Sequence, residues 1–272
     1  MDVASPVHVR DVNGARFAWR EAGDGPLVVL LHGLGGSRIA WEPQLAALAH
    51  RWHVAAWDLP GYGGSAALPE EPVTFRALAG AAAAWIGALG GERAHVVGIS
   101  MGGMIAQYLA AWHPQLVRSL TLMSTSPRFG LDGTDPVTWR AARLAPLDAG
   151  LEPSDFSERV LRSIAGTQIS EEAFQQQQAA MARITAAALR RSIDCIVTHD
   201  SRDLLPSITA PTLVLAGEFD RETPPEYSQY LADHIPGATL VVVPHAGHLL
   251  GAEAPEQVNR LLAQHLTATE AA

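Results

Sequence analysis

The sequence from residue 98 to residue 103 limits the folds open to this chain more than any other feature. It reads Gly-Ile-Ser-Met-Gly-Gly and joins the apolar run 95–99 to the apolar run 101–112. A strand that turns directly into a helix at Ser100 needs glycine two positions before and two after it, because side chains there would clash. Such a turn holds the hydroxyl at the tip of a sheet, beside a helix N-terminus that favours negative charge. We predict that Ser100 is a nucleophile; the alternative is an incidental serine in a glycine-rich turn.

Strand-like and helix-like segments alternate along most of the chain. The expected strands are residues 7–10, 16–20, 27–31, 53–57, 95–99, 119–123, 212–216 and 239–243. The expected helices are residues 41–50, 74–89, 101–112, 225–235 and 255–266. The later strands are almost continuously apolar, as in a parallel sheet that helices cover on both faces. The pattern therefore predicts an α/β fold with a mostly parallel eight-stranded sheet flanked by helices.

The alternation stops between about residues 127 and 207. This segment contains no convincing strand, and its helix candidates are residues 136–144, 154–164, 170–184 and 185–199. Strands resume at residue 212. We therefore expect a core made of residues 1–126 and 207–272, with residues 127–206 inserted as a helical cap over the carboxyl ends of the strands.

Charge and composition exclude several classes of function. The formal net charge of −9 disfavours binding to the phosphates of nucleic acids. All 19 basic residues are arginine, so a Schiff-base lysine, a P-loop lysine and a Ser–Lys dyad are excluded. The single cysteine, Cys195, can form neither an internal disulfide nor a cysteine-based zinc site, and we expect it in the core.

No segment of the sequence is typical of export or of membrane insertion. Residues 1–9 contain an acidic residue and no apolar run after a basic stretch, unlike a signal peptide. The most apolar stretch, residues 81–89, is too short to span a bilayer. These features predict a cytoplasmic protein with no membrane partner.

Two late histidines are candidates for the base that a serine nucleophile needs at neutral pH. In a scaffold of this kind the acid and then the histidine follow the serine in the chain. His248 is the preferred base, because Gly247 allows close backbone approach and a helix starts shortly afterwards; His245 is the alternative.

The acid that orients this base is expected on the loop after the strand 212–216. Asp220 lies where that loop could direct a carboxylate at the imidazole, fix its tautomer and stabilise the imidazolium. Glu218 and Glu222 are the alternatives, each with a surface position as its simpler interpretation.

Acyl transfer also needs hydrogen-bond donors for the oxyanion that forms. The glycine-rich loop 32–36 follows an early strand and leaves backbone N–H groups accessible. The amides of Leu34 and Met101 are the expected donors, and His32 is expected to be a structural hydrogen-bonding residue. Asp58 precedes the nucleophile in the chain, so we interpret it as stabilising its own loop.

Taken together, these motifs resemble the α/β-hydrolase superfamily over nearly the whole chain. The His-Gly pair at 32–33, the loop 58–65, the turn at Ser100, the segment 217–220 and the Gly-His pair at 247–248 occur in the order typical of that fold. The resemblance implies an α/β-hydrolase fold with a helical cap. It also implies hydrolysis through the serine, the aspartate and the histidine, with no cofactor and no metal.

Parts of the sequence resemble one group within this superfamily. The stretches 100–107, 113–117 and 200–205 are similar to 3-oxoadipate enol-lactonases, which hydrolyse a lactone in aromatic catabolism. The resemblance implies a small-molecule ester or lactone as substrate. Hydrolases of meta-cleavage products, which cut carbon–carbon bonds, commonly carry Asn before the serine, where this chain has Ile99.

Other members of the superfamily remain alternatives or are disfavoured. A small-molecule receptor with slow hydrolysis and a haloperoxidase-like perhydrolase would both keep the same serine. Haloalkane dehalogenases and epoxide hydrolases use Asp as nucleophile, so Ser100 argues against them.

Four arginines of the expected cap are candidates for binding an acidic substrate, because a guanidinium pairs well with a carboxylate. They are Arg140, Arg143, Arg190 and Arg191. The alternative for each is a solvated helix face. The sequence identifies neither the substrate nor the oligomeric state.

Overall fold

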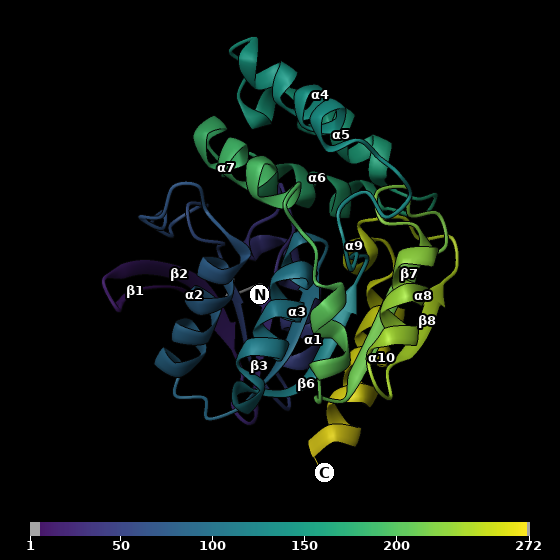
Figure 1. The fold of residues 1–272 in the computed structure, drawn as a ribbon. Helices are drawn as coiled ribbons and strands as arrows, with labels where there is room; N and C mark the ends of the chain where they lie inside the picture. The colour runs from purple at the N-terminus through teal and green to yellow at the C-terminus, as the bar shows by residue number, and fades with distance from the viewer. Residues whose placement is uncertain (1–5, 271–272) are drawn as a thin grey trace.

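The computed structural model describes residues 6–270, and its centre is one eight-stranded sheet (Figure 1). The strands are β1 (Val7–Val12), β2 (Ala15–Ala22), β3 (Leu27–Leu31), β4 (His53–Trp57), β5 (Ala94–Ile99), β6 (Val117–Met123), β7 (Thr212–Gly217) and β8 (Thr239–Val243). They lie in the order β1-β2-β4-β3-β5-β6-β7-β8. β2 is antiparallel to β1 and to β4, and all other neighbours are parallel. The predicted mostly parallel eight-stranded sheet is confirmed.

Alternate residues of the central strands face opposite sides of the sheet and enter two separate cores. In β3, Val29 and Leu31 belong to one buried cluster, whereas Val28 and Leu30 belong to the other. Every residue of this strand is buried. Because both faces are covered, the strand needs apolar side chains at every position, and its sequence is a continuous apolar run.

Helices cover both faces of the sheet. On one face lie α2 (Phe75–Ala88), α3 (Met101–Trp112) and α8 (Pro225–His234), and on the other α1 (Glu42–Leu48) and α10 (Pro255–Glu270). The shorter helices are η1 (Arg38–Trp41), η2 (Pro114–Leu116), η3 (Arg202–Ser207) and α9 (Leu250–Glu253). The Thr74 hydroxyl accepts the Ala77 amide at 3.2 Å and caps α2.

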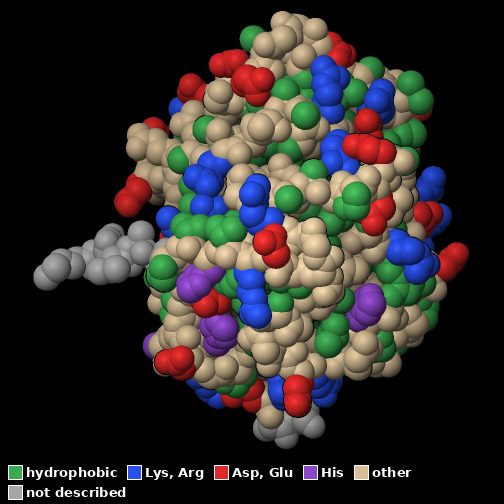
Figure 2. All heavy atoms as spheres, turned by 90° about the vertical axis from the view of Figure 1, so that its left-hand side faces the viewer, with side chains coloured by type: hydrophobic (Ala, Val, Ile, Leu, Met, Phe, Trp, Pro, Cys, Tyr) green, Lys and Arg blue, Asp and Glu red, His purple; other side chains and the backbone are tan. Residues whose placement is uncertain are grey.

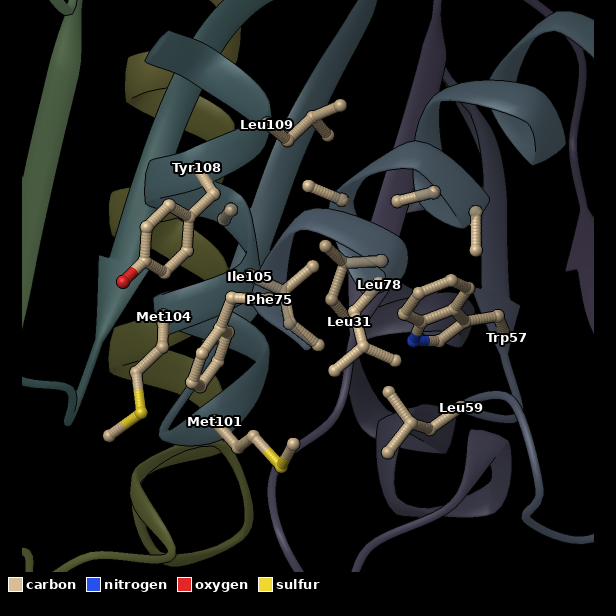
Figure 3. Close-up of a cluster of buried hydrophobic side chains, with 14 of the residues drawn as sticks. Leu31, Trp57, Leu59, Phe75, Leu78, Met101, Met104, Ile105, Tyr108 and Leu109 are labelled. Carbon is tan, nitrogen blue, oxygen red and sulfur yellow. The ribbon is translucent and has the colours of Figure 1, made fainter. Parts of the chain in front are cut away.

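The larger core lies between the sheet and the helices α2 and α3 (Figure 3). It contains Leu31 and Trp57 from the sheet, Leu78 from α2 and Ile105 from α3. The ring of Trp57 is fully buried and stacks on Trp85 with centroids 5.4 Å apart. This packing fixes α3 against the sheet, so the N-terminus of α3 has a defined position at the sheet edge.

Four α-helices between β6 and β7 stack over one end of the sheet, at the top of Figure 1. They are α4 (Pro136–Asp148), α5 (Pro153–Ile164), α6 (Glu171–Met181) and α7 (Ala186–Ile196). The side chains of Asp135, Ser170 and Thr185 cap three of them. α4 continues past its predicted end at residue 144, because Pro146 lies inside the helix without ending it. The division into a core and a cap at residues 126 and 206 stays a prediction.

The surface carries acidic and basic side chains side by side on the face shown in Figure 2. Every basic side chain there is arginine, since the chain has no lysine. Cys195 is buried, as expected. None of the helices within residues 6–270 combines the length and the hydrophobicity that a bilayer-spanning segment requires.

Candidate active site

Ser100 lies between β5 and α3 in a backbone conformation that L-residues rarely adopt. Its φ is 53° and its ψ is −122°. The Ser100 amide donates to the Met123 carbonyl at 2.9 Å, so the sheet holds the turn. A Cβ at Gly98 would collide with the Gly102 carbonyl, and a Cβ at Gly102 would collide with the Leu31 carbonyl. The turn therefore requires both glycines, as the sequence predicted, and backbone strain of this kind concentrates at functional sites.

The imidazole of His248 and the carboxylate of Asp220 are in direct contact. Their loops follow β8 and β7, which are parallel neighbours, so the sheet brings the two loops together. His248 Nδ1 lies 3.0 Å from each carboxylate oxygen. The Asp220 side chain is 0% exposed and that of His248 is 10% exposed. Nδ1–H donates to the carboxylate, which leaves Nε2 as the basic nitrogen of the ring.

Three further hydrogen bonds hold the Asp220 carboxylate. The amides of Glu222 and Thr223 donate to Oδ1, and the Thr223 hydroxyl donates to Oδ2, each at 3.0 Å. Burial alone would raise the pKa of Asp220, but the charge and hydrogen bond of His248, together with the Thr223 bonds, hold this pKa below its ordinary value. Asp220 is therefore an anion that can orient the imidazole and stabilise its protonated form.

Ser100 and His248 line the same cavity. Within residues 6–270 the ring's hydrogen-bonding neighbours are Asp220 and Thr223, and the Ser100 hydroxyl is not among them. Proton transfer needs a separation of roughly 2.6–3.2 Å, and such contacts often tighten only when substrate binds. Burial alone would lower the pKa of His248, but the Asp220 carboxylate raises it above its ordinary value. The ring is thus a competent base once the two groups approach.

The alternative acids and the alternative base have other contacts. Glu218 is exposed and accepts the His245 amide at 2.8 Å. Glu222 binds the guanidinium of Arg143 with both oxygens. The His245 side chain is 67% exposed. The geometry favours the acid and the base that the sequence put first.

The backbone around Leu34 and Met101 borders Ser100. Leu34 lies in a turn closed by the Gly36 amide, which donates to the Gly33 carbonyl at 3.1 Å. A Cβ at Gly33 would lie 2.8 Å from the Cβ of Ser100, so this turn passes directly beside the serine. Met101 begins α3, where an amide has no helical acceptor. Neither amide donates a hydrogen bond to another group of residues 6–270, as an oxyanion site requires.

His32 and Asp58 stabilise the loops around the site. The Leu59 amide donates to His32 Nε2 at 2.9 Å, so the proton is on Nδ1, which donates to the Gly33 carbonyl at 2.9 Å. Burial lowers the pKa of His32 and keeps the ring neutral. Asp58 accepts the Arg38 amide at 3.0 Å and pairs with the Arg38 guanidinium. The structural roles predicted for both residues are confirmed.

A cavity of about 540 Å³ lies between the end of the sheet that carries Ser100 and the inserted helices. Ser100, His248 and Leu34 line it from the sheet end. Apolar side chains line it from the inserted helices, among them Trp139, Phe156, Leu161, Met181, Leu189 and Ile193. No three His, Cys, Asp or Glu side chains in the described part of the chain are grouped so that they could hold a metal ion. The cavity suits a small molecule with an apolar portion.

Three of the four candidate cap arginines lie away from this cavity. Arg140 and Arg190 form ion pairs between α4 and α7, each with an N–O distance of 2.6 Å. Arg191 donates to the backbone carbonyls of residues 68 and 70 at 2.9 and 2.7 Å. Of the two interpretations, the substrate clamp is wrong for these three, because they are outside the cavity lining and their guanidinium groups already have partners.

Arg143 does line the cavity, but its guanidinium is bound to Glu222 at 2.7 and 2.6 Å. Arg159 of α5 and Arg221, in the loop before α8, also line the cavity, and both are exposed. Sequence reasoning missed both. The available signal for Arg159 was its spacing of three residues from Phe156, which places the two on one side of a helix.

The sheet order, the serine turn after a central strand and the acid–histidine pair on later loops define an α/β-hydrolase. The chain matches the model of the Alpha/beta hydrolase family over residues 28–261. It belongs to that family, and the predicted fold class and enzyme class are confirmed.

Relatives include enzymes that act on esters and on lactones. A pimeloyl-[acyl-carrier protein] methyl ester esterase from Chromobacterium violaceum is 34% identical over 257 residues, which are 90% of this chain and 95% of that protein. The solved enol-lactonase from Burkholderia xenovorans LB400 is 27% identical with a TM-score of 0.79, covering 96% of this chain and 100% of that one. A hydrolase from Pseudomonas aeruginosa PA01 is 28% identical with a TM-score of 0.85, covering 97% and 99%. These likenesses support an ester hydrolase in general rather than a lactonase in particular.

Proposed function

We propose that the protein is a serine hydrolase that cleaves a carboxylic ester or a lactone through an acyl-enzyme. The observation that carries the proposal is the Asp220–His248 contact at the cavity that Ser100 also lines. The esterase relative supports an ester as substrate, and the enol-lactonase structure supports a lactone. The apolar lining of the cavity favours a substrate with an apolar portion.

In the proposed reaction, Ser100 Oγ attacks the carbonyl carbon while His248 Nε2 takes the hydroxyl proton. The amides of Leu34 and Met101 bind the resulting oxyanion. When the oxyanion collapses, the bond to the leaving oxygen breaks and that oxygen receives the proton from the imidazolium. The same imidazole then takes a proton from water, whose oxygen attacks the acyl carbon. When this second oxyanion collapses, the bond to Ser100 Oγ breaks and Oγ takes the proton back from the imidazolium. Asp220 stabilises the imidazolium in both halves, and the reaction needs neither a metal nor a cofactor.

A panel of small substrates tests this proposal. It contains p-nitrophenyl esters of increasing acyl length, five- and six-membered lactones, and a ring-cleavage product with a scissile carbon–carbon bond. Turnover of esters or lactones at roughly 1–10³ s⁻¹ is the expected result for an enzyme of this kind. Turnover of the ring-cleavage product alone would contradict the proposal. Turnover slower than about one per minute, with ligand-dependent binding of a partner, would instead indicate the receptor alternative.

The pH dependence of kcat/KM is a further prediction. Only neutral His248 can accept the proton of Ser100, and the Asp220 carboxylate raises the pKa of this imidazole above its ordinary value of 6.5. We therefore expect kcat/KM to be maximal above that raised pKa and to fall as the pH is lowered through it. The measurement is kcat/KM for a p-nitrophenyl ester between about pH 5 and 9 at constant ionic strength. A limb centred below 6.5 would contradict the raised pKa of His248, and a profile with no acid limb would contradict its assignment as the base.

A further inference from the structure

The loop that carries His248 is hydrogen-bonded directly to the inserted helices. The His248 amide donates to the carbonyl of Ile164, the last residue of α5, at 2.9 Å. Three residues beyond the end of α5, the Thr167 amide donates to the His245 carbonyl at 3.2 Å. The backbone position of the proposed base therefore depends on how the segment after α5 lies against it.

Glu253, the last residue of α9, accepts hydrogen bonds from both sides of this contact and is only 5% exposed. Its Oε2 accepts the Gly166 amide at 2.7 Å and the Gly247 amide at 2.9 Å, and its Oε1 accepts the Leu249 amide at 3.0 Å. Gly247 and Leu249 are the two neighbours of His248 in the chain. One buried carboxylate thus holds the backbone on both sides of the base and joins it to the segment after α5.

Glycine is required where the two segments meet. A Cβ at Gly166 would lie 2.5 Å from the Gly247 nitrogen and 2.6 Å from Glu253 Oε2. A Cβ at Gly247 would collide with the Gly166 nitrogen. The two backbones are therefore in contact without intervening side chains, and Glu253 is the acceptor that satisfies both amides.

Burying a carboxylate costs free energy, and the three amides that donate to Glu253 offset this cost. Burial raises the pKa of Glu253, and its three backbone N–H donors oppose that rise. All three bonds go to the backbone beside His248 or to the segment after α5, and Glu253 itself does not line the cavity. Glu253 therefore does not contact a molecule in the cavity; it reaches the site through the backbone that it holds and through its charge, which interacts with that of Asp220.

We propose that Glu253 is a positioning residue that keeps the His248 imidazole aligned with Asp220 and Ser100 by fixing the backbone on both sides of the ring to the cap. This proposal rests on the proposed function. A loosened backbone would misplace the ring, and a displacement of about 1 Å at a catalytic group can cost about 100-fold in rate.

The substitution Glu253→Gln tests the proposal. Whichever way the amide rotates, its NH₂ group faces at least one of the three N–H donors that the carboxylate accepts. We expect kcat for a p-nitrophenyl ester to fall about 10- to 100-fold while KM changes less than about threefold. The acid limb of the pH profile should move to lower pH, because a looser contact with Asp220 raises the pKa of His248 less. Glu256→Gln, the same change at an exposed position of α10, is the matched control and should behave like the wild type.

A double-mutant cycle separates positioning from a general loss of structure. In the His248→Ala background, Glu253→Gln should leave the residual rate within about twofold, because its effect acts through the missing ring. Equal losses in both backgrounds would overturn the proposal, as would an unchanged kcat in folded Glu253→Gln. Should that variant not fold, Glu253→Asp keeps the charge but shortens the side chain by one CH₂ group, which withdraws it from the same three amides, and is expected to give the same loss of kcat. If the wild-type protein turned over no ester or lactone, the proposed function itself would be contradicted. This outcome is distinct from the ones that would overturn the positioning role of Glu253.

Discussion

Replacing Ser100 with alanine is expected to lower kcat for a good ester substrate by about 10⁴- to 10⁶-fold, because the variant cannot form the acyl-enzyme. KM should change little, since the Ser100 hydroxyl is one small group in the wall of a cavity of about 540 Å³. The fold should persist, because the strained turn depends on the glycines at 98 and 102 and on the Ser100 backbone, all of which remain. The residual rate would come from the oxyanion donors and from substrate binding alone.

The measurement is steady-state hydrolysis of p-nitrophenyl esters, with mass spectrometry of wild type and variant after brief mixing with substrate. An acyl adduct on the wild-type protein that is missing from Ser100→Ala would support the covalent step. Ser207→Ala, at an exposed position on η3, is the matched control and should retain full activity. Retained turnover in Ser100→Ala would refute the nucleophile assignment.

The fold could be predicted because its signals are local. Runs that are continuously or almost continuously apolar, such as 27–31 and 95–99, are typical of strands that helices cover on both faces, and the structure has β3 and β5 there. The turn at Ser100 could be predicted for the same reason. A Cβ at Gly98 or Gly102 would collide with backbone atoms that lie within a few residues or on the adjacent strand. A local steric requirement leaves a fixed pattern of residue types in the sequence.

The contact between Asp220 and His248 could also be predicted, because parallel strands bring the loops at their carboxyl ends together. Asp220 and His248 each follow a strand, and those strands are neighbours in the sheet. The two residues are 28 positions apart in the chain, so no local pattern links them. Their contact follows from the order of the strands in the sheet.

The partners of charged side chains on the inserted helices could not be predicted. Helix periodicity places Arg140 and Arg190 on helix surfaces, but their ion pairs depend on how α4 lies against α7. The contacts of Glu253 could not be predicted either. Its three donors are backbone amides, and because almost every residue has one, no residue type in the sequence marks them. The cap boundaries, the cytoplasmic location and the lactone specificity stay predictions.

Replacing Asp220 with asparagine is expected to lower kcat by about 10³- to 10⁴-fold through the tautomer of His248. The amides of Glu222 and Thr223 both donate to Oδ1, so the asparagine oxygen should occupy that position and its NH₂ group the position of Oδ2. Both positions lie 3.0 Å from His248 Nδ1, and the NH₂ group would then donate to Nδ1. The ring proton would be held on Nε2, which could no longer accept the proton of Ser100.

The same substitution predicts a shift in the pH profile, which separates this mechanism from simple misfolding. The Asp220 carboxylate raises the pKa of His248, so its removal lowers that pKa and moves the acid limb of kcat/KM to lower pH. The measurement is the pH profile of Asp220→Asn beside the wild type, with Asp11→Asn on the exposed face of β1 as the matched control. A large loss of kcat with the acid limb unmoved would mean that Asp220 does not act on the ring through its charge. An unchanged kcat would remove Asp220 from the mechanism, because a base whose tautomer is set by another group would not depend on this carboxylate.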